Sequence, residues 1–228
     1  MTVPASPIRF DNVRQSLVLP RNLFGPFGIF LTAAMLLGLL PAVAHAQVWM
    51  DKSAVLKDFF AKSDIVRSKR LALTPVQVAA VKQRLGYAPA VEWTVYYGLT
   101  KDKAGGPDKI DGLAVIDNEL GQHQPITFAA LVGADGTMRR LEVMVYREAY
   151  GDAIRENRFR QQFQGKTARD PVRHGHDIVA VAGATISSRS MATGARRALI
   201  VLDELVIRPG IARALTPAKV AVGASGVQ

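Results

Sequence analysis

Hydrophobic and polar positions follow two different patterns along the chain. In two segments between about positions 50 and 90, apolar residues recur every three or four positions, the spacing of a helix with one buried face. This spacing predicts a short helix over 51–61 and a second helix that Thr74 and Pro75 open and Gly86 ends. Thr is a good N-cap, Pro fits the first turn, and Gly suits the position after the last turn.

After Val91 the chain alternates between segments rich in β-branched and aromatic residues and segments rich in turn residues. The predicted strands cover 92–99, 110–116, 126–132 and 138–146. Asp135 and Gly136 predict a hairpin between the last two strands.

Helical spacing returns in the last third of the chain. A helix over 152–163 would turn Ile154, Phe159 and Phe163 inward, and 187–207 carries the strongest helical pattern of all. Strands followed by helices predict an α+β fold, a mainly antiparallel sheet with helices packed on it. The expected divisions are a helical N-terminal part over 47–90, the main domain over 91–208 and a flexible tail over 209–228.

The N-terminus has the features of a secretory signal peptide. An apolar run over 27–40 follows three arginines, and Ala44-His45-Ala46 offers the small-x-small cleavage pattern. Removal of 1–46 would leave an exported protein, periplasmic or at the outer face of the cytoplasmic membrane. Because 25–43 is apolar throughout, an uncleaved membrane anchor is the alternative.

Composition narrows the possible chemistry. The formal net charge is +10, but the basic residues are scattered and do not alternate with aromatic residues, so we do not expect nucleic-acid binding. The chain has no cysteine, which excludes disulfides, Cys-ligated iron–sulfur clusters, zinc-thiolate sites and c-type haem. Redox chemistry would therefore need a cofactor that is held in another way.

One segment, 177–188, combines features that suit a phosphorylated ligand. An apolar, strand-like run ends at small residues over 182–184, which let a bulky group approach the backbone. Ser187 and Ser188 then open the long predicted helix, whose free amide groups and dipole favour an anion. The same residues are equally those of an ordinary strand–turn–helix junction with hydroxyl caps.

Residues 182–188, Ala-Gly-Ala-Thr-Ile-Ser-Ser, resemble the flavinylation motif of the FMN-binding domain family. Its members include the C subunit of the sodium-pumping NADH:quinone reductase, the G subunit of the Rnf complex and the exported domain of NosR-type proteins. The segment 141–166 is similar to the family's strand, its glutamate-containing loop and its Phe-x-x-Gln-Phe-x-Gly-Lys stretch. The resemblance covers about 126–205.

The resemblance implies a cofactor, FMN, joined covalently to Thr185 by a phosphoester. The residues implied around the phosphate and in the motif are Ala182, Gly183, Ala184, Ile186, Ser187 and Ser188. Those implied near the flavin ring are Glu148, Tyr150 and Gly151, and Asp177 matches the acidic position that the attaching enzyme requires. Ala182 replaces the family's usual Ser or Thr, and 149–152 departs from its usual Thr-Pro-Gly-x-Gly.

The function implied is that of an exported electron carrier, not an enzyme in itself. Its implied partners are an FMN transferase that takes FMN from FAD, and a membrane or periplasmic redox partner. Two alternatives are an exported flavin-binding sensory or regulatory module, and a flavin-dependent reductase, which would need an acid–base residue near the ring.

Other candidate sites have simpler interpretations. His174, His176 and Asp177 fit a solvated loop better than a metal site, because no distant ligand cluster completes them. Ser187 and Ser190 lack the Gly-x-Ser-x-Gly elbow of a hydrolase nucleophile. A set of arginines predicts a solvated face or, alternatively, a docking surface for an acidic redox partner: Arg155, Arg158, Arg160 and Arg169.

Overall fold

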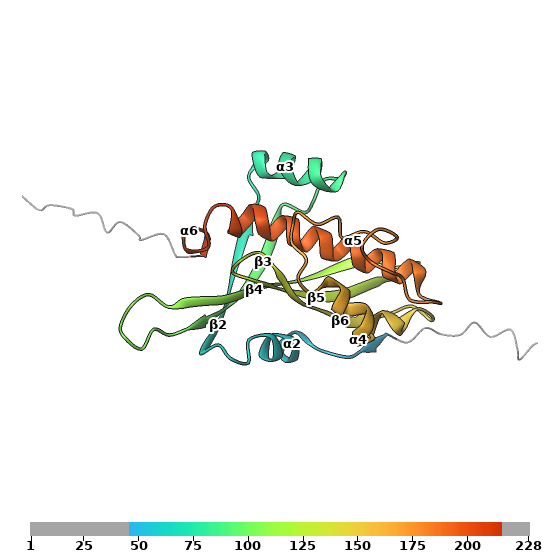
Figure 1. Ribbon diagram of the computed structural model, residues 1–228, viewed down its shortest axis with the longest axis horizontal. Helices are drawn as coiled ribbons and strands as arrows, with labels where there is room; N and C mark the ends of the chain where they lie inside the picture. The colour runs from blue at the N-terminus through green and yellow to red at the C-terminus, as the bar shows by residue number, and fades with distance from the viewer. Residues whose placement is uncertain (1–45, 216–228) are drawn as a thin grey trace, which may run out of the picture. The chain divides into compact units, whose positions relative to one another are not determined.

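The computed structural model describes residues 46–215, which form an α+β fold around one antiparallel sheet of six strands (Figure 1). The strands are β1 (Gln47–Val48), β2 (Ile65–Ala72), β3 (Glu92–Thr100), β4 (Lys109–Leu120), β5 (Pro125–Gly133) and β6 (Met138–Tyr146). The helices are α2 (Lys52–Phe59), α3 (Pro75–Leu85), η1 (Asp152–Arg155), α4 (Asn157–Arg160), η2 (Gln161–Phe163), α5 (Thr185–Leu202), η3 (Asp203–Ile207) and α6 (Ile211–Leu215). The predicted signal peptide, apart from Ala46, and the end of the predicted tail lie outside the described residues.

The sheet is a meander from β2 to β6, and the N-terminal strand β1 pairs with the outer edge of β6. All four predicted strands are confirmed, as is the turn at Asp135 and Gly136, where Gly136 adopts a φ of +79°. Strand β2, which pairs with β3 along its whole length, was not predicted from the sequence. This edge strand has one side in solvent, and its central Arg67-Ser68-Lys69-Arg70 hides the alternating pattern.

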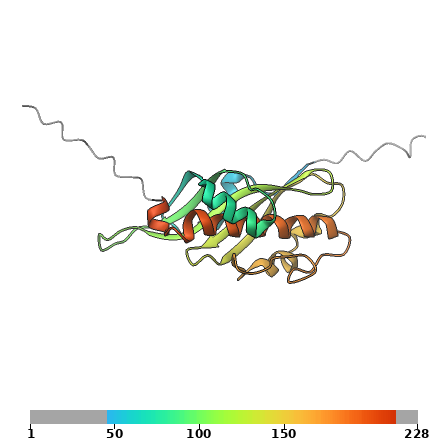
Figure 2. The same ribbon diagram turned by 90° about the horizontal axis from the view of Figure 1, so that it is seen from above.

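Helices cover both faces of the sheet (Figure 1). On one face α5 lies so close to β5 that a Cβ at Gly194 would come within 2.6 Å of the Phe128 ring, so only glycine fits. On the other face α2 places Val55 against Ala129 and Met144. Seen from above, α3 lies obliquely over α5 (Figure 2), and Arg84 of α3 forms a salt bridge with Asp203 across 2.8 Å.

Three segments differ from the prediction. The helix expected over 152–163 is divided into η1, α4 and η2, because Glu156 has an extended backbone (φ −59°, ψ 140°). Its three inward side chains are nevertheless fully buried, as predicted. The long helix begins at Thr185, two residues early, and its end, η3, is a π-helix. The expected flexible tail begins with α6, in which Leu215 is buried.

Within residues 46–215, none of the helices combines the length and the apolar content needed to cross a membrane.

Candidate functional site

The segment before α5 is a loop, not the strand-like run that the sequence predicted. Its β-type pairing is limited to one isolated bridge, between His174 and Ile178. Ile178 is buried while Val179 is 72% exposed, so the apolar residues of this run do not enter the core as a continuous strand. The loop ends in a turn in which the Ala184 amide donates to the Val181 carbonyl across 3.0 Å. Gly183 takes the left-handed position of this turn, with a φ of +77°, a conformation that glycine adopts without strain.

Thr185 is the first residue of α5 and its side chain is exposed. The N-cap residue is Ala184, and no side chain in the described part of the chain caps this helix. The amide groups of the first turn are therefore open to an external partner, and the helix dipole favours an anion there. A hydroxyl thus stands directly at an anion-binding helix end.

A pocket of about 260 Å³ opens at this helix end and gathers residues from three separate segments. Its lining residues are Gln122, Glu148, Tyr150, Gly151, Gly183, Ala184, Thr185, Ile186 and Ser187. The structure therefore brings most of the predicted site residues together. Gln122, which was not predicted from the sequence, reaches the pocket from the β4–β5 turn.

Three predicted residues lie outside this pocket. Ser188 is fully buried, and its hydroxyl accepts a hydrogen bond from the Val181 amide at 3.2 Å, which ties the turn to α5. Ala182 is exposed on the turn and lines a neighbouring hollow with Phe159 and Gln162.

Asp177, the third of them, organises the preceding loop. Its carboxylate accepts hydrogen bonds from the Arg173 amide at 2.8 Å and from Lys166 Nζ at 2.9 Å. Partial burial alone would raise the pKa of Asp177, but these donors and the Lys166 charge lower it overall. The ionised Asp177 carboxylate therefore stabilises the loop that leads to residues 182–188.

A hydrogen-bonded pair beneath the pocket joins β6 to α5. The Tyr146 hydroxyl donates to the Tyr150 carbonyl and lies 2.8 Å from Ser187 Oγ, which therefore donates to the Tyr146 oxygen. Gly151 sits directly over this pair with a φ of +98°, and a Cβ there would lie 2.6 Å from Tyr146 Oη. Burial raises the pKa of Tyr146, so this hydroxyl stays protonated. No local pattern predicts this role for Tyr146, because it requires the 41-residue separation from Ser187 to be closed.

Glu148 faces the pocket but already has partners. Its Oε1 accepts hydrogen bonds from the amides of His123 at 2.6 Å and Gln124 at 2.9 Å. Burial opposes the charge, yet these amides lower the pKa of Glu148 overall. The carboxylate thus fixes the β4–β5 turn beside the pocket.

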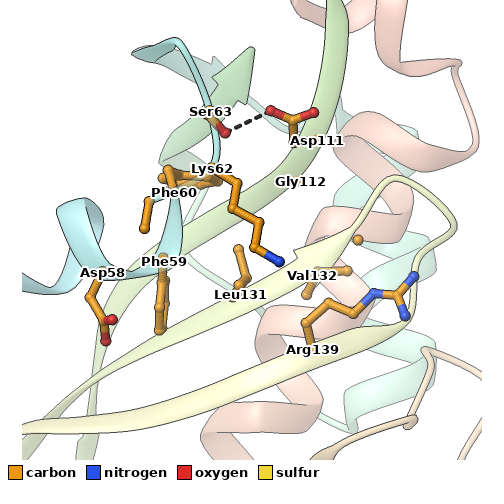
Figure 3. A pocket seen from close by; sticks show the side chains of 12 residues that line it. Asp58, Phe59, Phe60, Lys62, Ser63, Asp111, Gly112, Leu131, Val132 and Arg139 are labelled. Carbon is orange, nitrogen blue, oxygen red and sulfur yellow. Dashed lines mark hydrogen bonds between the residues drawn. The ribbon is translucent and has the colours of Figure 1, made fainter. Parts of the chain in front are cut away.

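A separate pocket of about 280 Å³ lies under α2 on the opposite face of the sheet (Figure 3). Lys62 extends across it toward Leu131, and Ser63 donates to Asp111 across 2.6 Å (Figure 3). It contains none of the residues predicted for cofactor binding.

Three of the four arginines of the predicted basic face have contacts within the fold. The Arg155 guanidinium lies 5.1 Å from the centre of the Trp49 ring, Arg158 pairs with Glu156, and Arg160 pairs with the buried Glu142. Arg155, Arg158 and Arg169 are nevertheless exposed, so a docking surface for an acidic redox partner stays a prediction.

Comparison with known proteins supports a family for the part of the chain that builds the pocket. Residues 121–200 match the family model described as the FMN-binding domain, and no curated protein matches the chain. Among solved structures, NqrC from Shewanella oneidensis is similar, with 18% sequence identity, 64% of this chain and 82% of that chain covered, and a TM-score of 0.41. The matched residues contain every residue that lines the pocket at the start of α5. Residues 121–200 of this chain are therefore similar to the FMN-binding domain family.

Proposed function

We propose that this protein is an exported electron carrier that holds one FMN covalently, through a phosphoester to Thr185. The observation that carries the proposal is the placement of an exposed threonine hydroxyl at the uncapped start of α5, inside the pocket of an FMN-binding domain. The fit of FMN also depends on the residues that would face its phosphate and its ring.

The residues present suit the phosphate end of FMN. The open amides at 185–187 supply hydrogen-bond donors, and Gly183, which has no side chain, leaves room beside them. The Ser187 hydroxyl is hydrogen-bonded to Tyr146. Ser187 therefore forms part of the pocket wall with a fixed orientation.

The rim of the pocket suits the flavin ring. Tyr150 is 83% exposed and Ile186 is 47% exposed, an unusual pair of large apolar surfaces beside one opening. A bound ring would cover part of this surface, and burial of apolar area would stabilise the complex.

When bound, FMN would supply the electron transfer, and the chain would hold it and control access to it. The carboxylate that lines the pocket, that of Glu148, is engaged by two backbone amides. This arrangement supports a carrier role over a reductase, since a general acid or base must be able to reach a substrate.

Covalent attachment suits a protein outside the cytoplasm. A reversible site would lose its cofactor by mass action where free FMN is scarce, and a phosphoester prevents this loss. The proposal therefore includes an FMN transferase as the maturation partner and a membrane or periplasmic redox partner. Asp177 would act in maturation by keeping its loop in the conformation that the transferase meets.

Intact mass spectrometry of the protein co-expressed with a flavin transferase tests the attachment. The wild type should gain the mass of FMN less one water and fluoresce in a denaturing gel, whereas Thr185→Ala should do neither. Thr193→Ala is the matched control, because Thr193 is a second threonine of α5 whose hydroxyl bonds only the Arg189 carbonyl. Flavin on Thr185→Ala, or none on the wild type, would contradict the proposal.

A further inference from the structure

A second pocket lies along α5, beyond the one that contains Thr185. It measures about 310 Å³ and is formed by α5, the end of α3 and the loop that follows Pro171. Its lining residues are Leu85, Tyr87, Val172, Arg173, His174, Arg189, Ala192, Thr193 and Arg196. It shares none of them with the proposed flavin pocket, and no aspartate or glutamate is among them.

The arginines of this pocket differ from two other arginines at or beside α5. Arg84 and Arg197, which also contact α5 or belong to it, each bind two carboxylates. Within residues 46–215, the guanidinium groups of Arg173 and Arg189 have no hydrogen-bond or salt-bridge partner, and both residues are exposed. Two free guanidinium groups therefore border one hollow.

Arg196, deeper in the same pocket, is incompletely satisfied. Its Nη2 donates to the Arg84 carbonyl at 2.7 Å, while its buried Nε has no partner, the one such side-chain atom found among the described residues. Burial and the like charge of Arg173 lower the pKa of Arg196. A buried N–H without an acceptor destabilises the fold, and so do like charges held close together.

We propose that the pocket lined by Arg173, Arg189 and Arg196 binds a small multivalent oxyanion, a phosphate or a polycarboxylate. Guanidinium groups bind both through paired, charge-assisted hydrogen bonds. Such a ligand would neutralise the convergent positive charges. Leu85, Val172 and the Tyr87 ring form an apolar wall that suits a small organic body attached to the anion.

The pocket lies close to the proposed flavin site but is independent of it. Arg189 is four residues after Thr185, one helical turn, or about 6 Å, further along the same face of α5. Its occupant would therefore add negative charge near a group at Thr185, although neither pocket needs the other to be filled.

Isothermal titration of the full-length chain with inorganic phosphate, and separately with citrate, tests this inference at matched ionic strength, with chloride as the reference anion. Both variants Arg173→Gln and Arg189→Gln should weaken binding about tenfold, the loss expected when a charge-assisted hydrogen bond is removed. Both side chains are exposed, so these variants should fold. Whichever of phosphate and citrate binds more tightly identifies the class of the natural ligand.

Two controls distinguish binding in this pocket from a general attraction of anions to a basic protein. Arg67→Gln removes one exposed charge on β2, outside the pocket, and should leave the affinity unchanged. Titrations repeated in the Thr185→Ala background should show the same dependence on Arg173 and Arg189, whatever the outcome for flavin attachment. The inference is overturned if neither anion binds the wild type, or if Arg67→Gln weakens binding as much as the pocket variants do.

Discussion

The middle of α5 and its first turn are held in opposite ways. In the middle, Arg197 is 12% exposed and contacts Asp117 at 2.7 Å and Glu119 at 2.5 Å, both on β4. Burial opposes its charge, but these carboxylates raise the pKa of Arg197 overall. At the first turn, Thr185 and Ile186 are exposed and the helix has no side-chain cap.

The difference shows how this fold can combine rigidity with an open site. The ion pairs fix the middle of α5 on the sheet, and Ser187 and Ser188 tie its first turn to neighbouring segments, while the start of the helix has no side-chain cap. A helix end with unused donors is costly unless water or a ligand satisfies them, and a rigid support keeps such an end in place. The neighbours Arg196 and Arg197 repeat the contrast, since one lacks an acceptor for Nε and the other has two carboxylates.

The largest effect should follow from breaking the rigid part. Arg197→Met leaves Asp117 and Glu119 as partly buried carboxylates without their cation, and should lower the free energy of unfolding by about 3 kcal/mol. Urea denaturation of the variant measures this loss. The matched change, Arg189→Met, affects an exposed arginine of the same helix and should shift stability by less than about 0.5 kcal/mol. Equal losses in both variants would show that the ion pairs do not anchor α5.

A smaller effect is expected from crowding the loop at the open end. Gly151→Ala would place a Cβ 2.6 Å from Tyr146 Oη, at a φ of +98°, and should cost about 2–3 kcal/mol while reducing flavin attachment. Gly165→Ala is the control, because Gly165 has a φ of +84° with no atom within 4 Å of the added Cβ, so it should cost only about 1 kcal/mol. Thermal unfolding and the flavin fluorescence of both variants distinguish the clash from the backbone strain.

The third prediction concerns pH. Because the pKa of Glu148 is lowered in the folded state, its carboxylate stabilises the fold above the ordinary glutamate pKa of about 4.3, and this contribution is lost as pH falls through the folded value. Glu148→Gln should therefore be about 1 kcal/mol less stable than the wild type at pH 7, and the difference should disappear under acidic conditions. Urea titrations over a pH series give the comparison. A difference that stays constant with pH would show that the carboxylate charge is not involved.

The smallest effect should come from Tyr146→Phe, which removes one hydroxyl and its bonds to Tyr150 and Ser187. The expected loss is about 1 kcal/mol, with the core aromatic ring retained. If the hydroxyl positions the 148–151 loop, the spectrum of attached flavin should shift as well. Ser190→Ala is the control. Ser190 lies further along α5 and its hydroxyl donates to the Leu120 carbonyl of β4, so its loss should leave the flavin spectrum unchanged.

Local patterns predicted much of the fold. Thr74 and Gly86 bound α3 as expected, and Gln77 completes a capping box that was not predicted. The strands that are rich in β-branched and aromatic residues were also found. The edge strand β2 was missed because only its pairing with β3 makes it a strand, and the break at Glu156 was missed because the inward spacing of Phe159 and Phe163 suits a continuous helix.

By itself, the sequence determined that 182–188 could receive a phosphate, since small residues, hydroxyls and a helix start are local properties of consecutive positions. It could not determine what faces Thr185. Gln122, Glu148 and Tyr150 reach the same pocket only because the meander brings the β4–β5 turn and the end of β6 beside α5. Likewise, the carboxylate partners of Arg197 and the single hydrogen bond of Arg196 join residues about 80 or more positions apart in the sequence. Packing of the whole chain brings such residues together, and no local preference does so.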